Sequence, residues 1–461
     1  MAIKRDSVNL TEGPILQQII FFAIPLLLGQ LFQQLYNSVD SIVVGRFVGT
    51  TALAAVSSSG DISMLLTGFF VGFSSGASVV FGRAFGANKL DKLHSAIHTA
   101  LLFAVMIGVS IAFLGILCTP LLLRLVNCPP DVWIESERYL RVYLIGVLFT
   151  SVYNVGAGVL RAVGDSRNPL IFLIISSCTN IVLDLCFVAW LGWGVMGVAV
   201  ATVISQFTSV VLVVRKMLVT EDVYKLVPSD LKIDRALLKE ILSLGLPAAV
   251  QASLLSISNM VVQRNINGFG STVMAGAGVG KRIDRFCGLV PHCIGMALSV
   301  FASQNIGARK YARVYRSIRT CVLICTVFTV MLWIPTFLFT HEVSGIFTKD
   351  PAAIDIAVRM VRVMMPFYLF QGLYQVYSGV LRSFGRSRAV MILSLVGMIG
   401  FRQVYLATAL ALDHRIEHIF FCFPVGWIAA AAMMFAYYWF KIRRIYPAED
   451  LPQQEFAAPD D

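Results

Sequence analysis

The most constraining feature of this 461-residue chain is a series of stretches, twenty or more residues long, that carry almost no charge. Ala100 to Leu123 contains no charged side chain, and between Leu170 and Val214 the only one is Asp184. About 20 residues of α-helix match the thickness of a bilayer's hydrocarbon core. Because these runs are long and continuous rather than short and alternating, we expect an all-α membrane protein and not a β-barrel.

The composition supports the same interpretation. Hydrophobic residues make up 57% of the chain and charged residues only 14%, too few to cover the surfaces of soluble domains. The first apolar run, Ile15 to Val44, is too long for the core of a cleaved signal peptide. Nine cysteines show neither a CxxC pair nor metal-ligand spacing, so we expect them to pack as small hydrophobic side chains.

The apolar runs between polar breaks predict twelve transmembrane helices in two sets of six. The first set is expected at 15–45, 53–80, 96–118, 135–158, 169–190 and 194–217. The second set is expected at 240–265, 273–301, 317–340, 353–379, 389–412 and 416–440. This gives an N-terminal segment (1–14), a first six-helix lobe (15–218), a linker (219–238), a second lobe (239–440) and a tail (441–461).

The two halves are internal repeats. Gly86-Ala-Asn-Lys89 returns as Gly307-Ala-Arg-Lys310, at a shift of 221 in the numbering. The segment Gly158 to Arg167 returns as Gly379 to Arg388 at the same shift. Six helices per half is an even number, so both halves should cross the membrane in the same orientation.

The distribution of basic residues predicts the topology. With the N-terminus inside, the cytoplasmic segments hold 24 of the 37 basic residues and the outer segments hold 9. The other four, Lys281, Arg282, Arg285 and Arg402, fall within spans. This bias follows the positive-inside rule, so both termini and the linker should be cytoplasmic. It also accounts for the net charge of +11 without a nucleic-acid partner.

Common catalytic motifs are missing from the sequence. The pair Gly280-Lys281 lacks the glycine spacing and the Ser or Thr of a Walker A loop, and no HExxH or exposed GxSxG turn occurs. His94 and His98, four residues apart, could bind a metal, but a solvated or interfacial pair is favoured because no third ligand is evident. We therefore expect a protein that is not an enzyme, with no cofactor and no structural metal.

Acidic residues inside apolar spans are the strongest functional signal, because a carboxylate is costly there and usually faces a cavity. Asp40 and Asp184 each lie about 9 Å from the outer end of their span at the helical rise. Asn180 shares a helix face with Asp184, and Thr202 and Asn154 could complete the set. Such oxygens suit a shared proton or a bound Na⁺ ion, and a purely structural pairing is the alternative.

Other polar and aromatic residues are candidates for lining a substrate cavity. We select Tyr36, Tyr153, Gln251, Arg282 and Gln375. For the basic residues inside the second lobe, three interpretations stay open: pairing with an acid, facing a polar cavity, or attracting an anionic substrate group. These basic residues are Lys281, Arg282, Arg285 and Arg402.

Several motifs resemble the multidrug and toxic compound extrusion (MATE) family over residues 7–445. They are Thr11-Glu-Gly-Pro-Ile, Ile24-Pro-Leu, Tyr36-Asn-Ser-Val-Asp40 and the duplicated Leu-Arg-x-x-Gly-x-Ser-Arg loops. The resemblance implies a V of two six-helix bundles in a bacterial inner membrane and antiport of organic cations against H⁺ or Na⁺. It also implies a cation site like that of the DinF-like branch, formed by Asp40, Asn180, Asp184 and Thr202, with Asn154 a less certain match.

The second lobe lacks an equivalent acidic site. At a shift of 221, Asp184 corresponds to Tyr405, Asn180 to Phe401 and Thr202 to Phe423. Coupling should therefore depend on the first lobe. The leading hypothesis is a monomeric exporter of cationic amphipathic molecules by alternating access. A flippase for a lipid-linked precursor is the alternative, whereas a membrane enzyme or a channel is disfavoured because its motifs are missing.

Overall fold

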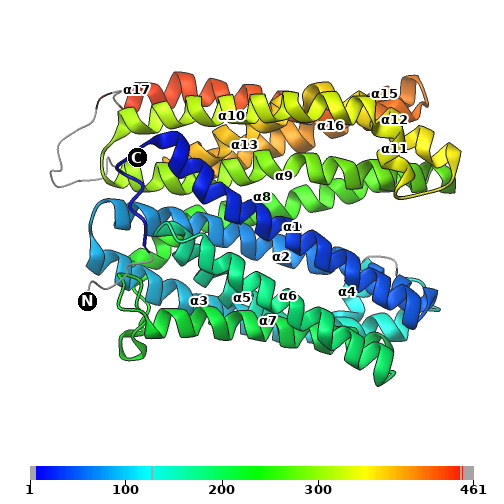
Figure 1. Cartoon of the computed structure of the whole chain (residues 1–461), viewed down its shortest axis with the longest axis horizontal. Helices are drawn as coiled ribbons and strands as arrows, with labels where there is room; N and C mark the ends of the chain where they lie inside the picture. The colour runs from blue at the N-terminus through cyan, green and yellow to red at the C-terminus, as the bar shows by residue number, and fades with distance from the viewer. Residues whose placement is uncertain (1–6, 126–127, 447–448, 450–461) are drawn as a thin grey trace. The chain divides into compact units, whose positions relative to one another are not determined.

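The computed structural model describes residues 7–125, 128–446 and 449; for residues 37, 41–42, 50–59 and 61 it describes the backbone alone. Every element in this part of the chain is helical (Figure 1). The first half comprises α1 (Ile15–Phe47), α2 (Thr50–Gly86), α3 (Leu90–Leu117), α4 (Thr119–Leu125), α5 (Trp133–Ala162), α6 (Arg167–Asp184), the π-helix η1 (Leu185–Trp190) and α7 (Gly194–Val219).

The second half repeats this order after the short η2 (Pro228–Asp230) of the linker. It comprises α8 (Arg235–Asn267), α9 (Ser271–Gly307), α10 (Tyr311–Leu338), α11 (Thr340–Gly345), α12 (Pro351–Met364), η3 (Met365–Phe367), α13 (Tyr368–Ser383), α14 (Ser387–Ser394), the π-helix η4 (Leu395–Phe401), α15 (Arg402–Leu412), α16 (Ile416–Tyr437), the π-helix η5 (Tyr438–Ile442) and α17 (Arg443–Ile445).

Eleven of the described helices are long and apolar enough to cross a membrane, and they coincide with eleven of the twelve predicted spans. The span predicted at 353–379 is helical from Pro351 to Ser383 and contains an irregular turn. The chain there forms α12 and α13, with the 3₁₀ turn η3 between them. Pro366 lies in this turn, and proline both lacks an N–H donor and clashes with the preceding helical turn. The all-α fold is confirmed, and the tenth predicted span is a helix interrupted by this 3₁₀ turn.

The repeat is visible in the backbone. Asn88 and Arg309, which correspond at the shift of the sequence repeat, have positive φ angles of 55° and 59°. In both turns the next residue, Lys89 or Lys310, donates its N–H to a carbonyl five residues earlier. Two pairs of glycines with positive φ repeat at the same shift: Gly49 with Gly270, and Gly164 with Gly385. The two halves therefore share their turns as well as their sequence motifs.

The chain forms two compact units. Unit 1 contains Ile24–Phe81 and Leu90–Ile257, together with the residues before Asn9. Unit 2 contains Asn9–Ala23, Gly82–Lys89 and the chain from Ser258 onward. These limits fall inside helices α1, α2 and α8, whereas the predicted lobes divide at the linker. The lobe boundaries therefore stay a prediction, and most of the predicted tail lies outside the described residues.

In unit 1, α2 packs closely against the first part of α8. A Cβ atom added to Gly72 would lie 2.5 Å from the carbonyl oxygen of Ala248. A Cβ atom added to Gly76 would collide with the backbone of Leu244 and Gly245. Small residues that face one another in this way let two helix backbones approach, as is common in membrane proteins.

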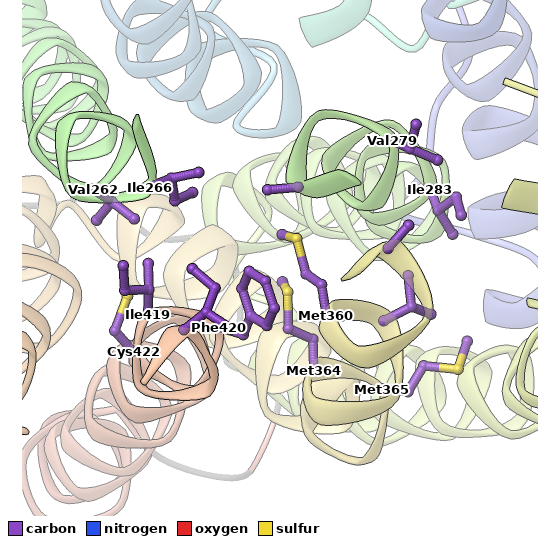
Figure 2. Close-up of a cluster of buried hydrophobic side chains, with 14 of the residues drawn as sticks. Val262, Ile266, Val279, Ile283, Met360, Met364, Met365, Ile419, Phe420 and Cys422 are labelled. Carbon is purple, nitrogen blue, oxygen red and sulfur yellow. The ribbon is translucent and has the colours of Figure 1, made fainter. Parts of the chain in front are cut away.

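Unit 2 has its own apolar core, built from α8, α9, α12 and α16 (Figure 2). Val262 and Ile266 of α8 face Ile419 and Phe420 of α16, and Met360 of α12 lies beside α9. These side chains are buried, so this core fixes the rotation of α8 about its own axis. That rotation decides which α8 side chains are available for other contacts.

The linker is held against the start of α3. The Nε2 atom of His98 accepts from the Val227 N–H at 3.0 Å, while its Nδ1 donates to the His94 carbonyl at 2.7 Å. His94 contacts Asp230 at 3.0 Å, and the hydrogen bonds from His94 and Ser229 hold the pKa of that carboxyl below its usual value. Of the solvated or interfacial pair expected from the sequence, His98 is buried and His94 is partly exposed.

Candidate ion-coupling site

The Asp40 and Asp184 side chains face each other in unit 1. Asp40 lies on α1 and Asp184 is the last residue of α6, and their carboxyls are within hydrogen-bonding distance of one another. Asp184 is fully buried and Asp40 is half-buried. Two carboxyls can hydrogen-bond only if one of them carries a proton. The pair is therefore arranged either to share a proton or to be bridged by a cation.

The atoms around this pair lack partners elsewhere in the described part of the chain. Apart from the opposing carboxyl, Asp40 Oδ1 and both Asp184 oxygens have no hydrogen-bond partner there. Neither polar atom of the Asn180 amide has one, although this side chain is 1% exposed. Leaving a buried polar group unsatisfied costs about 1–3 kcal/mol. A site with several such groups in one place is suited to take up a small polar species.

Three tyrosines surround the carboxyls. Tyr36 of α1 and Tyr139 of α5 interact electrostatically with both Asp40 and Asp184, and Tyr143 interacts with these two tyrosines. The Tyr139 and Tyr143 rings stack with centroids 6.1 Å apart. From the sequence, Tyr36 is expected to line a substrate cavity, and Tyr139 and Tyr143 are not among the candidates. The signal was available, because Tyr139 and Tyr143 are four residues apart and so share a helix face.

Local backbone features place the two acids. Directly after Asp184 the α-helix becomes the π-helix η1, and π-helical turns in α-helices are frequently found at functional sites. In α1, Pro25 removes a hydrogen bond near the start of the helix, and the helix joins unit 1 from Ile24 onward. The proline is evident in the sequence. The π-helix is not.

Two of the predicted ligands make hydrogen bonds within their own helices. The buried Thr202 hydroxyl donates to the Val198 carbonyl at 2.9 Å. The Asn154 amide donates to the Thr150 carbonyl at 2.8 Å. Asn180 thus lies beside Asp184 with its amide unpartnered among the described residues, while coordination by Thr202 and Asn154 stays a prediction.

The five cavity candidates are divided between the two units. In unit 1 the Tyr153 hydroxyl donates to the Pro169 carbonyl at 3.3 Å, and Gln251 is 2% exposed. In unit 2 Gln375 hydrogen-bonds to His292. Arg282 is exposed, with its guanidinium above the Phe347 ring. The structure thus gives Tyr153 a contact with the start of α6, and it places Arg282 at an accessible position.

The family model MatE matches this chain twice, over residues 25–186 and 247–407. The two matched segments are offset by almost the same shift as the sequence motifs, which confirms the repeat. This chain belongs to the MATE family. A MATE protein is a membrane transporter, so the expected class is confirmed, whereas assignment to the DinF-like branch stays a prediction.

Individual relatives of this MATE chain agree with the family match. It is 31% identical to the probable multidrug resistance protein YoeA of Bacillus subtilis, over 91% of this chain and 92% of that protein. A crystal structure of a MATE protein in complex with MaL6 has a TM-score of 0.90 at 22% identity, covering 96% and 99% of the two chains.

A second solved structure has the same fold. It is a MOP superfamily transporter from Pyrococcus furiosus, described as having a binding pocket of reverse polarity that suggests a different function. Its TM-score is 0.86 at 23% identity, and the alignment covers 94% of this chain and 97% of that one. At identities of 22% and 23%, these two structures show only that the MATE chain has the same fold as they do.

Proposed function

We propose that this MATE transporter exports amphipathic organic molecules, including cationic drugs, in exchange for H⁺ or Na⁺. The coupling ion binds at Asp40 and Asp184 in unit 1. The observation that carries the proposal is the facing pair of carboxyls, Asp184 buried and Asp40 half-buried, beside the Asn180 amide, which is unpartnered among the described residues. The similarity to the probable multidrug resistance protein of Bacillus subtilis supports the substrate class.

The geometry suggests how the ion changes the transporter. Without an ion, two carboxylates repel one another in a site of low polarity, which is unfavourable. A proton lets one carboxyl donate to the other, and Na⁺ would be held by carboxylate and amide oxygens. Either ion removes one net negative charge. It drives the transport cycle to the extent that it binds one conformation more tightly than the other.

Further parts of the proposal rest on the family and on the charge distribution. We place the protein in a bacterial cytoplasmic membrane with both termini cytoplasmic, and we assign it to the DinF-like branch. A flippase for a lipid-linked precursor is the second candidate. It is favoured by one observation, the buried Arg402 of unit 2, which has no carboxylate hydrogen-bonded to it among the described residues.

Efflux from proteoliposomes tests the coupling site. The purified chain is reconstituted, and ethidium efflux is measured under a pH gradient and a Na⁺ gradient, each imposed separately. We expect Asp184→Asn to reduce gradient-driven efflux at least about tenfold, because the amide keeps the volume but cannot titrate. Asp355→Asn, an exposed acid on α12, is the matched control and should transport normally. Undiminished gradient-driven efflux in Asp184→Asn would place the ion site elsewhere.

A further inference from the structure

Unit 2 contains a buried cation whose hydrogen-bond partners, among the described residues, are all neutral. The Arg402 side chain is 3% exposed. One guanidinium nitrogen donates to Asn259 Oδ1 at 2.9 Å, and a second donates to the Ser258 hydroxyl. Its Nε atom is buried with no acceptor in the described part of the chain. A charge at membrane depth without a charged partner is costly, so such residues usually mark a functional site.

A second cationic side chain hydrogen-bonds to the same segment of α8 as Arg402. Lys281 of α9 donates to the Gln263 side chain, and it interacts electrostatically with Arg402, Arg285 and Asp284. Asp284 also accepts a hydrogen bond from the Tyr368 hydroxyl at 2.6 Å. The group thus contains three cationic side chains and one carboxylate. Its net charge is positive, the opposite of the Asp40 and Asp184 site.

The neutral partners come from one segment of α8. Asn259 and Gln263 are four residues apart and therefore share a helix face, with Ser258 adjacent. Ser258 lies nine residues before the end of α8 at Asn267, which is about 14 Å along the helix. No acidic residue occurs between Ser258 and Asn267. The α8 face that holds Arg402 and Lys281 therefore offers them no neutralising charge.

Arg402 and Asp184 each lie next to a π-helix, but the two residues do not correspond to each other in the sequence repeat. Arg402 directly follows the π-helix η4, whereas Asp184 directly precedes the π-helix η1. At the shift of the sequence repeat Arg402 corresponds to Ile181, which is apolar. The cationic group is thus a property of unit 2 alone, and the repeat by itself does not explain it.

We propose that Arg402 and Lys281 form a binding site for the oxyanion, a phosphate or carboxylate, of an amphiphilic substrate. The Arg402 Nε is an unused donor for that oxyanion, and the Phe423 ring beside the guanidinium provides apolar contact for the rest of the molecule. Transport of this substrate rests on the proposed function, whereas its binding does not. A ligand with only a cationic group would be repelled here.

Binding to the purified chain in detergent tests the proposal without any ion gradient. Titration calorimetry compares octyl phosphate with octyltrimethylammonium, which has the same tail and the opposite charge. We expect octyl phosphate to bind more tightly, and Arg402→Gln and Lys281→Gln each to weaken its binding about tenfold, because each removes a charge-assisted hydrogen bond. The control is Arg443→Gln, whose guanidinium lies on Trp439 in the same unit, and it should leave binding unchanged.

Two further variants separate charge from structure. Arg402→Lys keeps the charge and should retain more affinity for octyl phosphate than Arg402→Gln. If Arg402→Gln does not fold, the half-exposed Lys281→Gln decides the question alone. Equal affinities for the two probes, or unchanged octyl phosphate binding in Lys281→Gln, would overturn the proposal. Ethidium efflux in the same preparation reports separately on the coupling site, so failure of the two proposals can be told apart.

Two arms then identify the source of the oxyanion. Proteoliposomes with fluorescent phosphatidylglycerol in one leaflet measure movement of a lipid headgroup, and uptake of radiolabelled octyl phosphate measures a soluble anion. If phosphatidylglycerol movement depends on Arg402, the oxyanion belongs to a lipid headgroup. If octyl phosphate uptake depends on Arg402, the oxyanion belongs to a soluble amphiphile. Either result supports the site. If neither probe is moved in a way that depends on Arg402, the site does not take a transported anion.

Discussion

At the scale of single residues, function is concentrated in side chains that are costly where they lie. Asp184 is fully buried, and its nearest polar neighbours, Asp40 and Asn180, give it no permanent donor in the described part of the chain. Thr202 is also buried, but its hydroxyl is satisfied within α7. Buried polar groups without a hydrogen-bond partner in the described part of the chain, such as those of Asp184 and Asn180, are therefore stronger site candidates than Thr202, whose hydroxyl is hydrogen-bonded.

A double-mutant cycle tests whether Asp40 and Asp184 act as one site. We expect Asp40→Asn and Asp184→Asn to abolish gradient-driven efflux to similar extents, and the double variant to be little worse than either, because residues that share one ion are not additive. Efflux at matched protein levels is the measurement. Gln375→Ala in unit 2 is the control, and it should alter substrate preference while ion dependence persists. Additive losses in the double variant would show two independent roles.

At the scale of elements, irregular helices and close helix packing position the candidate sites. The π-helices η1 and η4 border Asp184 and Arg402, and Pro366 divides α12 from α13. The contact of α2 with α8 rests on glycines, because the two backbones approach until no Cβ atom fits at Gly76. This contact holds α8 within unit 1 over its first half.

Replacing Gly76 tests the packing of α2 on α8. Gly76→Val should lower the unfolding temperature in detergent, since overpacking of this kind costs about 1–3 kcal/mol. Gly278→Val is the matched control, because a Cβ atom there has no neighbour within 4 Å. Both substitutions place the same residue within a helix, so helix propensity cancels in the comparison. Equal unfolding temperatures for the two variants would contradict this account of the contact.

At the scale of the whole molecule, the first and last continuously described residues, Ser7 and Tyr446, contact segments predicted to be cytoplasmic. In unit 1 the Ser7 hydroxyl donates to Asp222 of the linker at 2.8 Å. In unit 2 the Tyr315 hydroxyl, near the start of α10, donates to the Tyr446 carbonyl at 2.9 Å. The linker and the start of α10 both belong to the basic side in the sequence-based topology.

Reporter fusions test the orientation. A green fluorescent protein fused after Asp461 should fluoresce, and alkaline phosphatase at the same place should be inactive, because the tail is expected in the cytoplasm. Alkaline phosphatase inserted after Gly268, between α8 and α9, should be active and is the positive control. An active phosphatase after Asp461 would reverse the predicted topology.

The sequence by itself determined the helices, the repeat and part of the site. Helix ends, the shared turns at Asn88 and Arg309, and the common face of Asn180 and Asp184 all depend on residues that are close in the chain. The break at Pro366 could also have been predicted, because proline acts on its own helical turn. These features follow from local chemistry, so one chain without relatives was enough to predict them.

Only the tertiary structure decided which side chains meet. The pairing of Asp40 with Asp184, the tyrosines of α5 beside them, and the neutral partners of Arg402 join residues more than forty positions apart. Such contacts depend on how each helix is rotated and where its π-turns fall, and packing against neighbouring helices sets both. The periodicity of one helix shows which residues share a face, but not which helix that face will contact.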